Sequence, residues 1–306
     1  MNLPNAAFHP GFGGADRSQE QGAATADGEV AWFLSGEVFR SLDQMVASVD
    51  DCIESLPRPA RSDCPAPQDR FVMQQSSGQG GSGADTAKCV LVMEGPALVQ
   101  AELQVKIHKH PNTIHKTSIL PDAPWLLVQL QDAANMLTEA RRCADDAGQL
   151  RAQVKERVRA ETLDADFLRC LTARLSHSVE ELMRRLRRAQ DALLSPRKRT
   201  IQDHLSSENM KSLRPALPGD IAVSFYVQGH RLILAVYHLV PQRGSLHFDM
   251  FLAECCLPRL EAVLDGLTRT FQMGQELRRK LQWAVRFNRS RRPAQPPAPA
   301  RLQNGV

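Results

Sequence analysis

The sequence is poor in aromatic residues, in net charge and in long apolar runs. Aromatic residues make up only 5% of its 306 residues, too few for rows of rings that would stack on single-stranded nucleic acid. The formal net charge is +4, which by itself is too weak to indicate a nucleic-acid partner. No apolar run reaches the roughly 18 residues that a membrane-spanning helix needs. The N-terminus lacks a basic start followed by an apolar run, so we expect no signal peptide.

Signatures of catalysis and metal binding are equally scarce. The seven cysteines include no Cys-x-x-Cys pair, which fits reduced thiols in the cytosol or nucleus better than a disulfide framework. Gly-x-Ser-x-Gly, His-Glu-x-x-His and Walker patterns are missing. We therefore expect a protein that is not an enzyme and that uses no cofactor, metal or small-molecule substrate.

Three weak candidates for chemistry have simpler interpretations. The segment GQGGSG at 78–83 has the spacing of a dinucleotide-binding loop, but its Ser- and Gln-rich flank favours a linker. His108, His110 and His115 lie near an expected strand turn and could bind zinc. A solvated turn is favoured because no further ligands are suitably spaced. The pair Cys255 and Cys256 could suggest redox chemistry, but adjacent residues on a helix point in different directions, so burial is favoured.

The chain does contain apolar seams of helical spacing. The first runs through Val38, Leu42, Met45, Val49, Cys52 and Leu56, in alternating steps of four and three residues. We expect further helices after an Asp122 cap with a pause at Gly148, from near Asp164, and from near Cys255. Four seams in one chain favour an internal antiparallel bundle. An intermolecular coiled coil is the alternative.

Strand patterns fall between the helices. Residues 101–107 alternate apolar and polar side chains, and so do residues 221–227, which begin a hairpin. A lone hairpin is marginal in water, so we expect it to pair with strands near 88–119. The predicted fold is α+β, an elongated antiparallel four-helix bundle with a small antiparallel β domain.

The expected organisation along the chain has five kinds of segment. Both ends are expected to be disordered, and a flexible linker follows the first helix. The boundaries are 1–28 for the disordered N-terminal segment, 29–56, 122–195 and 255–286 for the helix bundle, 57–86 for the linker, 87–121 and 214–254 for the β domain, and 287–306 for the disordered Arg/Pro-rich tail.

Five blocks of the sequence, in chain order, resemble the Rogdi family of leucine-zipper-like proteins. The most characteristic is RPALPGDIAVSFYVQGHRLILAVYHL, which resembles the family's Pro-Ala-Leu-Pro-x-Asp opening and hairpin. The others are EVAWFLSGEVFRSL, CVLVMEGPALVQAELQVKI, WLLVQLQDAANMLTEA and ECCLPRLEAVLDGLTRTFQMGQELRRKL.

The resemblance implies an α domain of bundled helices and a β domain. It also implies a non-catalytic role as the small subunit of a RAVE complex, the regulator of the ATPase of vacuoles and endosomes. The implied partners are a large WD-propeller subunit of the rabconnectin type and the catalytic-sector subunits of the V-ATPase. The implied location is cytoplasmic and peripheral on vesicles or endosomal and vacuolar membranes, through partners. In animals the family is associated with synaptic vesicles and the nuclear envelope, so a nuclear pool is also expected.

Two groups of residues are candidates for partner binding. The hairpin offers Ser224 and Tyr226, on the strand face opposite Phe225, together with Tyr237. The tail offers Arg289, Arg291 and Arg292, which could form a localisation signal or touch anionic lipid. The alternative function is a nuclear or nucleic-acid-associated helical protein that uses the basic clusters 184–199 and 288–293. A solvated helix face is the simpler interpretation of the first cluster.

Overall fold

The computed structural model describes residues 28–30, 32–57, 68–75, 85–107, 114–160, 164–196, 200–242 and 245–290. The chain folds as two compact units that each draw on several stretches of sequence. Unit 1 comprises Met1–Gln44, Cys143–Glu180 and Met273–Val306, and unit 2 comprises Met45–Arg142 and Glu181–Gln272.

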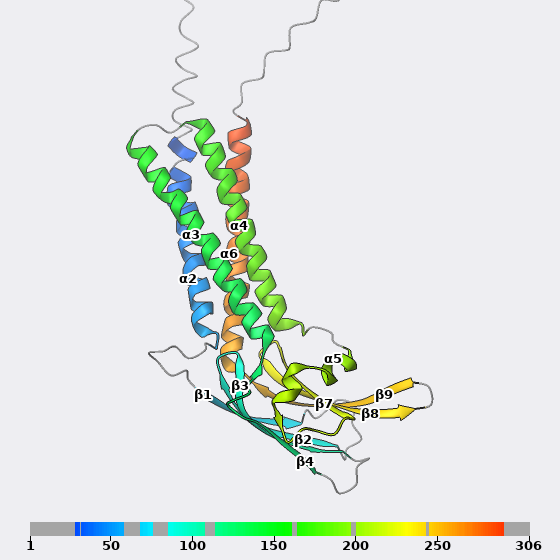
Figure 1. Ribbon diagram of the computed structural model, residues 1–306. Coiled ribbons are helices and arrows are strands. Elements are labelled where there is room, and N and C mark those ends of the chain that lie inside the picture. The colour runs from blue at the N-terminus through cyan, green and yellow to red at the C-terminus, as the bar shows by residue number, and fades with distance from the viewer. Residues whose placement is uncertain are drawn as a thin grey trace, which may run out of the picture. The chain divides into compact units, whose positions relative to one another are not determined.

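Four long helices contribute residues to both units (Figure 1). They are α2 (Phe39–Ser55), α3 (Val128–Arg159), α4 (Ala165–Leu194) and α6 (Pro258–Ser290). The shorter helices are the π-helix η1 (Leu34–Val38), α5 (Ile201–Leu205) and the 3-10 helix η2 (Glu208–Ser212).

The apolar seams of these helices are buried largely as predicted. All six seam residues of the first helix are at most 3% exposed. In α4 a seam with the same steps of four and three, from Leu175 to Leu193, is equally buried. In α6 the sequence predicts a seam through Leu260, Leu264, Leu267, Phe271 and Leu281, among others. This seam is only partly right, because Val263 and Leu277, which it omits, are buried. Burial of these seams removes apolar surface from water and so stabilises the packing of the helices.

The π-helix η1 has a physical cause in the sequence. The buried residues Val30, Leu34, Val38 and Leu42 follow one another at steps of four. At about 100° per residue, each such step would rotate an α-helical seam by roughly 40°. A wider turn with i→i+5 bonds offsets this rotation. η1 therefore keeps the start of the helix facing the same core as the remainder of α2.

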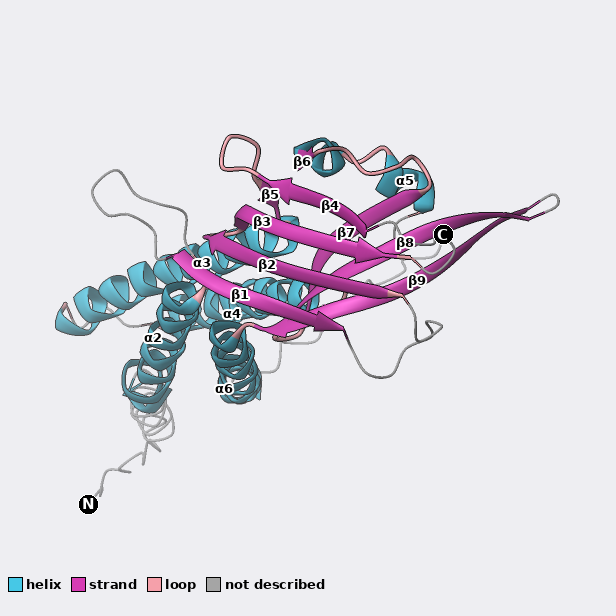
Figure 2. Cartoon of the chain, turned by 90° about the horizontal axis from the view of Figure 1, so that it is seen from below, coloured by secondary structure: helices cyan, strands magenta, loops and turns pink. Residues whose placement is uncertain are grey.

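All nine described strands join one antiparallel sheet, in the order β6-β4-β3-β2-β1-β9-β8-β7, with β5 pairing β3 (Figure 2). The strands are β1 (Gln68–Gln75), β2 (Thr86–Glu94), β3 (Ala97–Lys106), β4 (Ile114–Ile119), β5 (Trp125–Leu126), β6 (Leu213–Arg214), β7 (Ile221–Gln228), β8 (Arg231–Gln242) and β9 (Ser245–Cys256). The alternation predicted for β3 is confirmed, because Ala101, Leu103 and Val105 are buried while Glu102, Gln104 and Lys106 are exposed.

The prediction of an elongated four-helix bundle with a small β domain is wrong. The protein is α+β, but its β part is a nine-stranded sheet rather than a minor layer. Two signals were missed. β1 lies inside the segment predicted to be a flexible linker, and β9 adds a third strand directly after the predicted hairpin. β1 has a single apolar run of three residues between polar ones and so lacks the period-two pattern, whereas β9 alternates only over Ser245–Met250.

These missed strands also correct the predicted pairing. The β7–β8 hairpin pairs with β9, and β9 pairs with β1, so the hairpin does not pair directly with the strands near 88–119. Helix α6 begins at Pro258, so Cys255 and Cys256 lie on β9 and not on a helix.

Two details of α3 and α4 also bear on the prediction. α3 begins at Val128, after β5, so Asp122 is not its cap, and the helix continues through Gly148. The predicted start of α4 near Asp164 is confirmed, because the Asp164 carboxylate accepts a 2.6 Å hydrogen bond from the Phe167 amide, which is the geometry of a helix N-cap.

Candidate protein-interaction site

Strand β7 ends in a tight turn that fixes how its residues face. Gln228 pairs with Arg231, leaving a two-residue loop in which Gly229 has a φ of 66°, a conformation that glycine adopts at little cost. The Gly229 amide donates a 2.8 Å hydrogen bond to the Leu193 carbonyl, which satisfies an end group of α4. The hairpin is thus attached to the end of a helix, and its alternating side chains are held to fixed faces.

One face of β7 belongs to the core. Its members Ile221, Val223, Phe225 and Val227 are at most 6% exposed. The Phe225 ring meets Trp125 of β5 edge-on, with ring centroids 5.2 Å apart and planes at 77°. This is a favourable aromatic geometry, and it packs Phe225 against Trp125.

The Gln129 side chain, from the start of α3, is joined to the end of β7. Its carbonyl accepts from the Val227 amide at 2.8 Å, and its amide donates to the Val227 carbonyl at 2.8 Å. The same amide group donates to the Ala192 carbonyl at 2.9 Å. Gln129 therefore pairs with Val227 as a neighbouring strand would and also ties β7 to α4.

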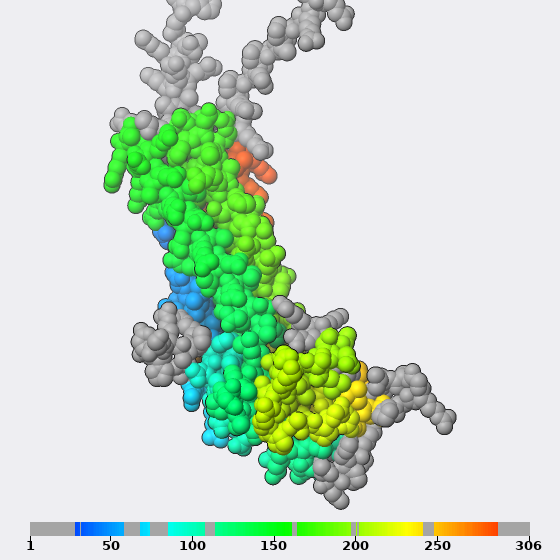
Figure 3. Space-filling model, in the orientation of Figure 1, coloured from blue at the N-terminus to red at the C-terminus, as the bar shows by residue number. Residues whose placement is uncertain are grey.

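A cavity of about 400 Å³ lies beside β7, within unit 2. One wall is the segment from Trp125 to Gln129, another is β7 from Val223 to Tyr226 with Tyr237 of β8, and the third holds His204, Ser207 and Asn209. Figure 3 shows the yellow-green surface of the segment containing α5 and β7 directly beside the green start of α3. No Asp, Glu, Lys or Arg side chain is among the described residues that line the cavity.

The second face of β7 is covered only in part. Ser224 and Tyr226 are half-buried, and so is Tyr237 on the paired strand. The Tyr237 ring stacks on His204 of α5 at 4.8 Å and meets Phe248 of β9 edge-on at 6.0 Å. Burial raises the pKa of both tyrosines above the usual value, and for Tyr237 the nearby Tyr226 raises it further. Both phenols therefore stay neutral hydrogen-bonding groups at physiological pH.

The structure brings three of the six predicted partner-binding residues together. Ser224, Tyr226 and Tyr237 share one face of the hairpin and line the same cavity. Arg289 lies on α6, but its side chain is outside the described residues, as are Arg291 and Arg292. Sequence reasoning missed Gln129, Trp125 and His204, since only the fold brings these residues to β7. Partner binding by any of the six residues stays a prediction.

The weaker candidates from the sequence are not assembled into a site by the described residues. His108, His110 and the segment GQGGSG lie outside these residues, and His115 lies on β4. No group of three or more His, Cys, Asp or Glu residues that could hold a metal ion occurs within the described ranges. Burial raises the pKa of the Cys255 thiol to about 12, which makes the reactive thiolate scarce at neutral pH.

The basic cluster on α4 is largely occupied by ion pairs. Arg185 contacts Glu139 at 2.6 Å and Glu181 at 3.2 Å, Arg184 also pairs with Glu181, and Arg187 lies 3.4 Å from Asp191. These carboxylates neutralise arginine side chains that could otherwise bind phosphate groups of a nucleic acid. The arrangement favours the simpler interpretation, a solvated helix face.

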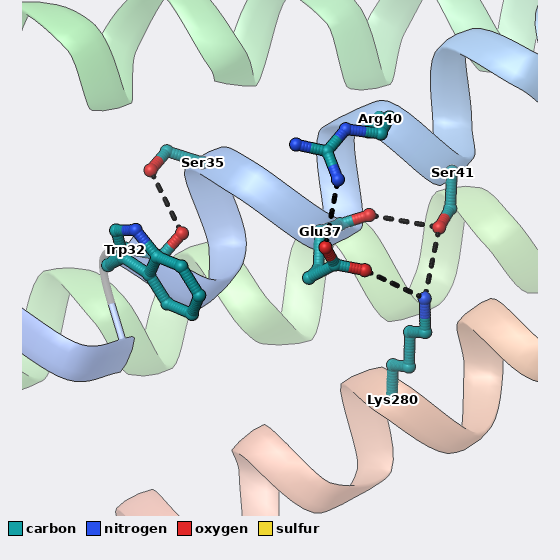
Figure 4. Close-up of polar contacts among 6 residues, drawn as sticks. All are labelled: Trp32, Ser35, Glu37, Arg40, Ser41 and Lys280. Carbon is teal, nitrogen blue, oxygen red and sulfur yellow. Dashed lines mark hydrogen bonds and ion pairs between the residues drawn. The ribbon is translucent and has the colours of Figure 1, made fainter.

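A polar network joins η1 and α6 in unit 1 (Figure 4). The Glu37 carboxylate accepts from Arg40 at 2.9 Å and from Lys280 at 3.3 Å, and Lys280 also donates to the Ser41 hydroxyl at 3.3 Å. Next to this network Phe33 packs edge-on against Trp283, at 5.3 Å. These contacts join the start of the first helix to α6. The ion pairs among them are exposed, and exposed ion pairs contribute little to stability.

Comparison with known proteins adds decisive information. The family model described as "Rogdi leucine zipper containing protein" matches residues 29–282. The chain belongs to the Rogdi family. It is 33% identical over 267 residues to "Protein rogdi" of Drosophila melanogaster, covering 87% of this chain and 91% of that protein. It is 28% identical over 281 residues to "Protein rogdi homolog" of Danio rerio, covering 83% and 91%. The homologue of Homo sapiens is 27% identical over 286 residues, covering 84% and 92%.

Membership of the Rogdi family confirms the resemblance seen in the sequence. The family match includes α2, β7 and most of α6, so both the helices and the β7 cavity lie within the shared region. None of the described helices is long and apolar enough to cross a membrane.

Proposed function

We propose that this Rogdi family member is a non-catalytic adaptor subunit of a RAVE-type complex. In this role it binds a large WD-propeller subunit of the rabconnectin type. The complex promotes assembly of the V-ATPase catalytic sector with its membrane sector, and so supports acidification of vesicles and organelles.

Family membership over residues 29–282 is the observation that carries this proposal. The cavity beside β7 is consistent with it. Its walls combine apolar surface with neutral hydrogen-bonding groups from Tyr226, Tyr237 and Asn209. Tyrosine is enriched where proteins bind one another, because one end of the ring is apolar and the other can form hydrogen bonds.

The proposed location follows from the proposed partners. The protein acts in the cytoplasm and reaches vesicles or endosomal and vacuolar membranes through the propeller and catalytic-sector subunits. A nuclear pool, or a function at the nuclear envelope, is part of the same proposal.

Affinity purification from the native cell tests the proposal. We expect the tagged chain to recover a large propeller protein and V-ATPase catalytic-sector subunits, while an unrelated tagged helical protein recovers neither. Recovery of other complexes without these subunits would contradict the proposal.

The nucleic-acid alternative predicts a different result. Binding to DNA through phosphate contacts would weaken steeply as the salt concentration rises, because bound counterions are released. The ion pairs of Arg184, Arg185 and Arg187 do not favour this alternative.

A further inference from the structure

Strand β7 is the last strand of the sheet order, so one of its edges has no neighbouring strand among the described residues. The turn closes at the Gln228–Arg231 pair. In an antiparallel hairpin with a two-residue loop this pair exchanges both backbone hydrogen bonds, and the pattern alternates along the strand. Ser224 and Tyr226 therefore bond to β8, whereas Val223, Phe225 and Val227 direct their N–H and C=O groups to the open edge.

The contacts at the two ends of the edge agree with this assignment. At one end, both backbone groups of Val227 bond to the Gln129 side chain. At the other end, the Ile221 amide donates to the Pro218 carbonyl at 3.0 Å. Between these contacts, no residue in the described part of the chain bonds to the outward backbone groups of Val223 and Phe225. An open edge of this kind is a template for one further strand.

The cavity lies along this part of the edge and limits what can enter. Its volume of about 400 Å³ is within the range of roughly 300–1,000 Å³ for binding pockets in proteins. The segment from Trp125 to Gln129 forms the wall opposite β7. Because no charged side chain lines the described walls, a charged group would lose its hydration there without a compensating partner.

We propose that the cleft beside β7 binds an extended, uncharged segment of a partner protein as an added strand. Backbone groups of this segment pair with Val223 and Phe225. Its side chains alternate between the apolar wall that holds Trp125 and the polar wall that holds His204 and Asn209. Gln129 occupies the next pairing position, at Val227, and ends the added strand there. Strand addition to a sheet edge is an established mode of peptide recognition.

Strand addition at β7 does not depend on the proposed role in V-ATPase assembly. Peptides can test which kind of ligand β7 binds without knowledge of the natural partner. If no propeller subunit is recovered, strand addition at β7 is not contradicted. If no peptide binds, the V-ATPase proposal is not contradicted.

The first experiment selects binders from a phage-displayed library of random nonapeptides against the full chain. We expect enrichment of peptides with an uncharged central stretch. Leu126, which is 44% exposed and lines the cleft, provides a variant that should fold normally. Leu126→Lys should weaken binding of the selected peptides at least tenfold. The control Val158→Lys changes a residue of similar exposure, 46%, that does not line the cleft, and should have no effect. No enrichment, or equal binding by both variants, would overturn the proposal.

Amide hydrogen exchange of the unmodified chain identifies the mode of binding. With the selected peptide bound, exchange at the Val223 and Phe225 amides should slow at least about tenfold. Exchange at Ser224 and Tyr226, whose amides already bond to β8, should change much less. A peptide that fills the cavity through side-chain contacts alone would leave all four exchange rates close to those of the free chain, and this outcome would rule out strand addition.

Discussion

The two faces of β7 differ in what surrounds them. Ile221, Val223, Phe225 and Val227 are nearly inaccessible to solvent, and Phe225 packs against Trp125. The other face carries Ser224 and Tyr226, which are half-buried and line a cavity. Alternate residues of β7 are therefore part of the core, and the residues between them form an uncharged surface that lines the cavity. Substitution of one residue should therefore lower mainly the stability of the protein, and substitution of its neighbour should weaken mainly the binding of a partner.

Phe225→Ala should produce the largest loss of stability. Removing a buried ring forfeits its transfer free energy and leaves a cavity, which together cost about 3–5 kcal/mol. Thermal or denaturant unfolding of the variant measures this loss. The matched control is Phe248→Ala on β9, where the side chain is 44% exposed, and we expect a loss below about 1 kcal/mol there. Similar losses in the two variants would mean that the buried face of β7 is not part of the core.

Gln129→Ala should have the second largest effect on stability. The change leaves the backbone groups of Val227 and the Ala192 carbonyl without their partner. Unpaired, part-buried groups cost about 1–3 kcal/mol each in proteins, less where water reaches them, so we expect a total loss of about 2–3 kcal/mol.

Gln131→Ala is the control for this variant, because Gln131 is exposed and bonds only within its own helix, to Asn135. We expect its free energy of unfolding to stay within about 0.5 kcal/mol of the wild type. If the two glutamine variants unfold alike, Gln129 does not hold the end of β7.

Chemical labelling of Cys255 and Cys256 tests whether neighbouring residues of β9 lie on different faces. This test has the smallest effect on the fold, because no residue is substituted. Cys256 is exposed, while its neighbour Cys255 is half-buried and burial raises its pKa to about 12. Because a raised pKa keeps the folded thiol protonated, iodoacetamide at pH 8 should label Cys256 much faster than Cys255. Mass spectrometry of digests measures both rates, and equal rates would indicate that β9 does not hold Cys255 as described.

The same raised pKa sets the direction of a pH effect on stability. In the unfolded chain the Cys255 thiol has its usual pKa of 9.0, while in the folded chain burial raises the pKa to about 12 and keeps the thiol protonated. The contribution of the protonated Cys255 thiol to the free energy of unfolding is therefore complete below pH 9 and is lost as the pH rises from 9 towards 12.

The helices could be predicted from the sequence because their signals are local. The seam from Val38 to Leu56 is complete within one stretch, and its burial follows from spacing alone. The π-helix was missed, although the four-residue steps from Val30 to Leu42 could have indicated it.

The sheet was harder to predict because its order joins distant segments. β1 pairs with β9 across more than 170 residues, at the Gln75–Ala253 pair, and no local pattern in either strand indicates this partner. The site shows the same limit. Ser224 and Tyr226 were found from the period-two pattern of β7, whereas Gln129 and Trp125 became relevant only because the fold brings them to the same strand.

Tyr226→Ala, compared with Phe225→Ala for both unfolding and binding to the large propeller subunit, tests the central claim most directly. We expect Tyr226→Ala to weaken the complex by more than about 2 kcal/mol, as interface aromatics do, while its free energy of unfolding falls by only about 1 kcal/mol. Phe225→Ala should show the larger loss of stability. An unchanged affinity for Tyr226→Ala, or equal losses of stability in the two variants, would contradict the account and leave the tyrosine face of β7 as part of the protein's own packing.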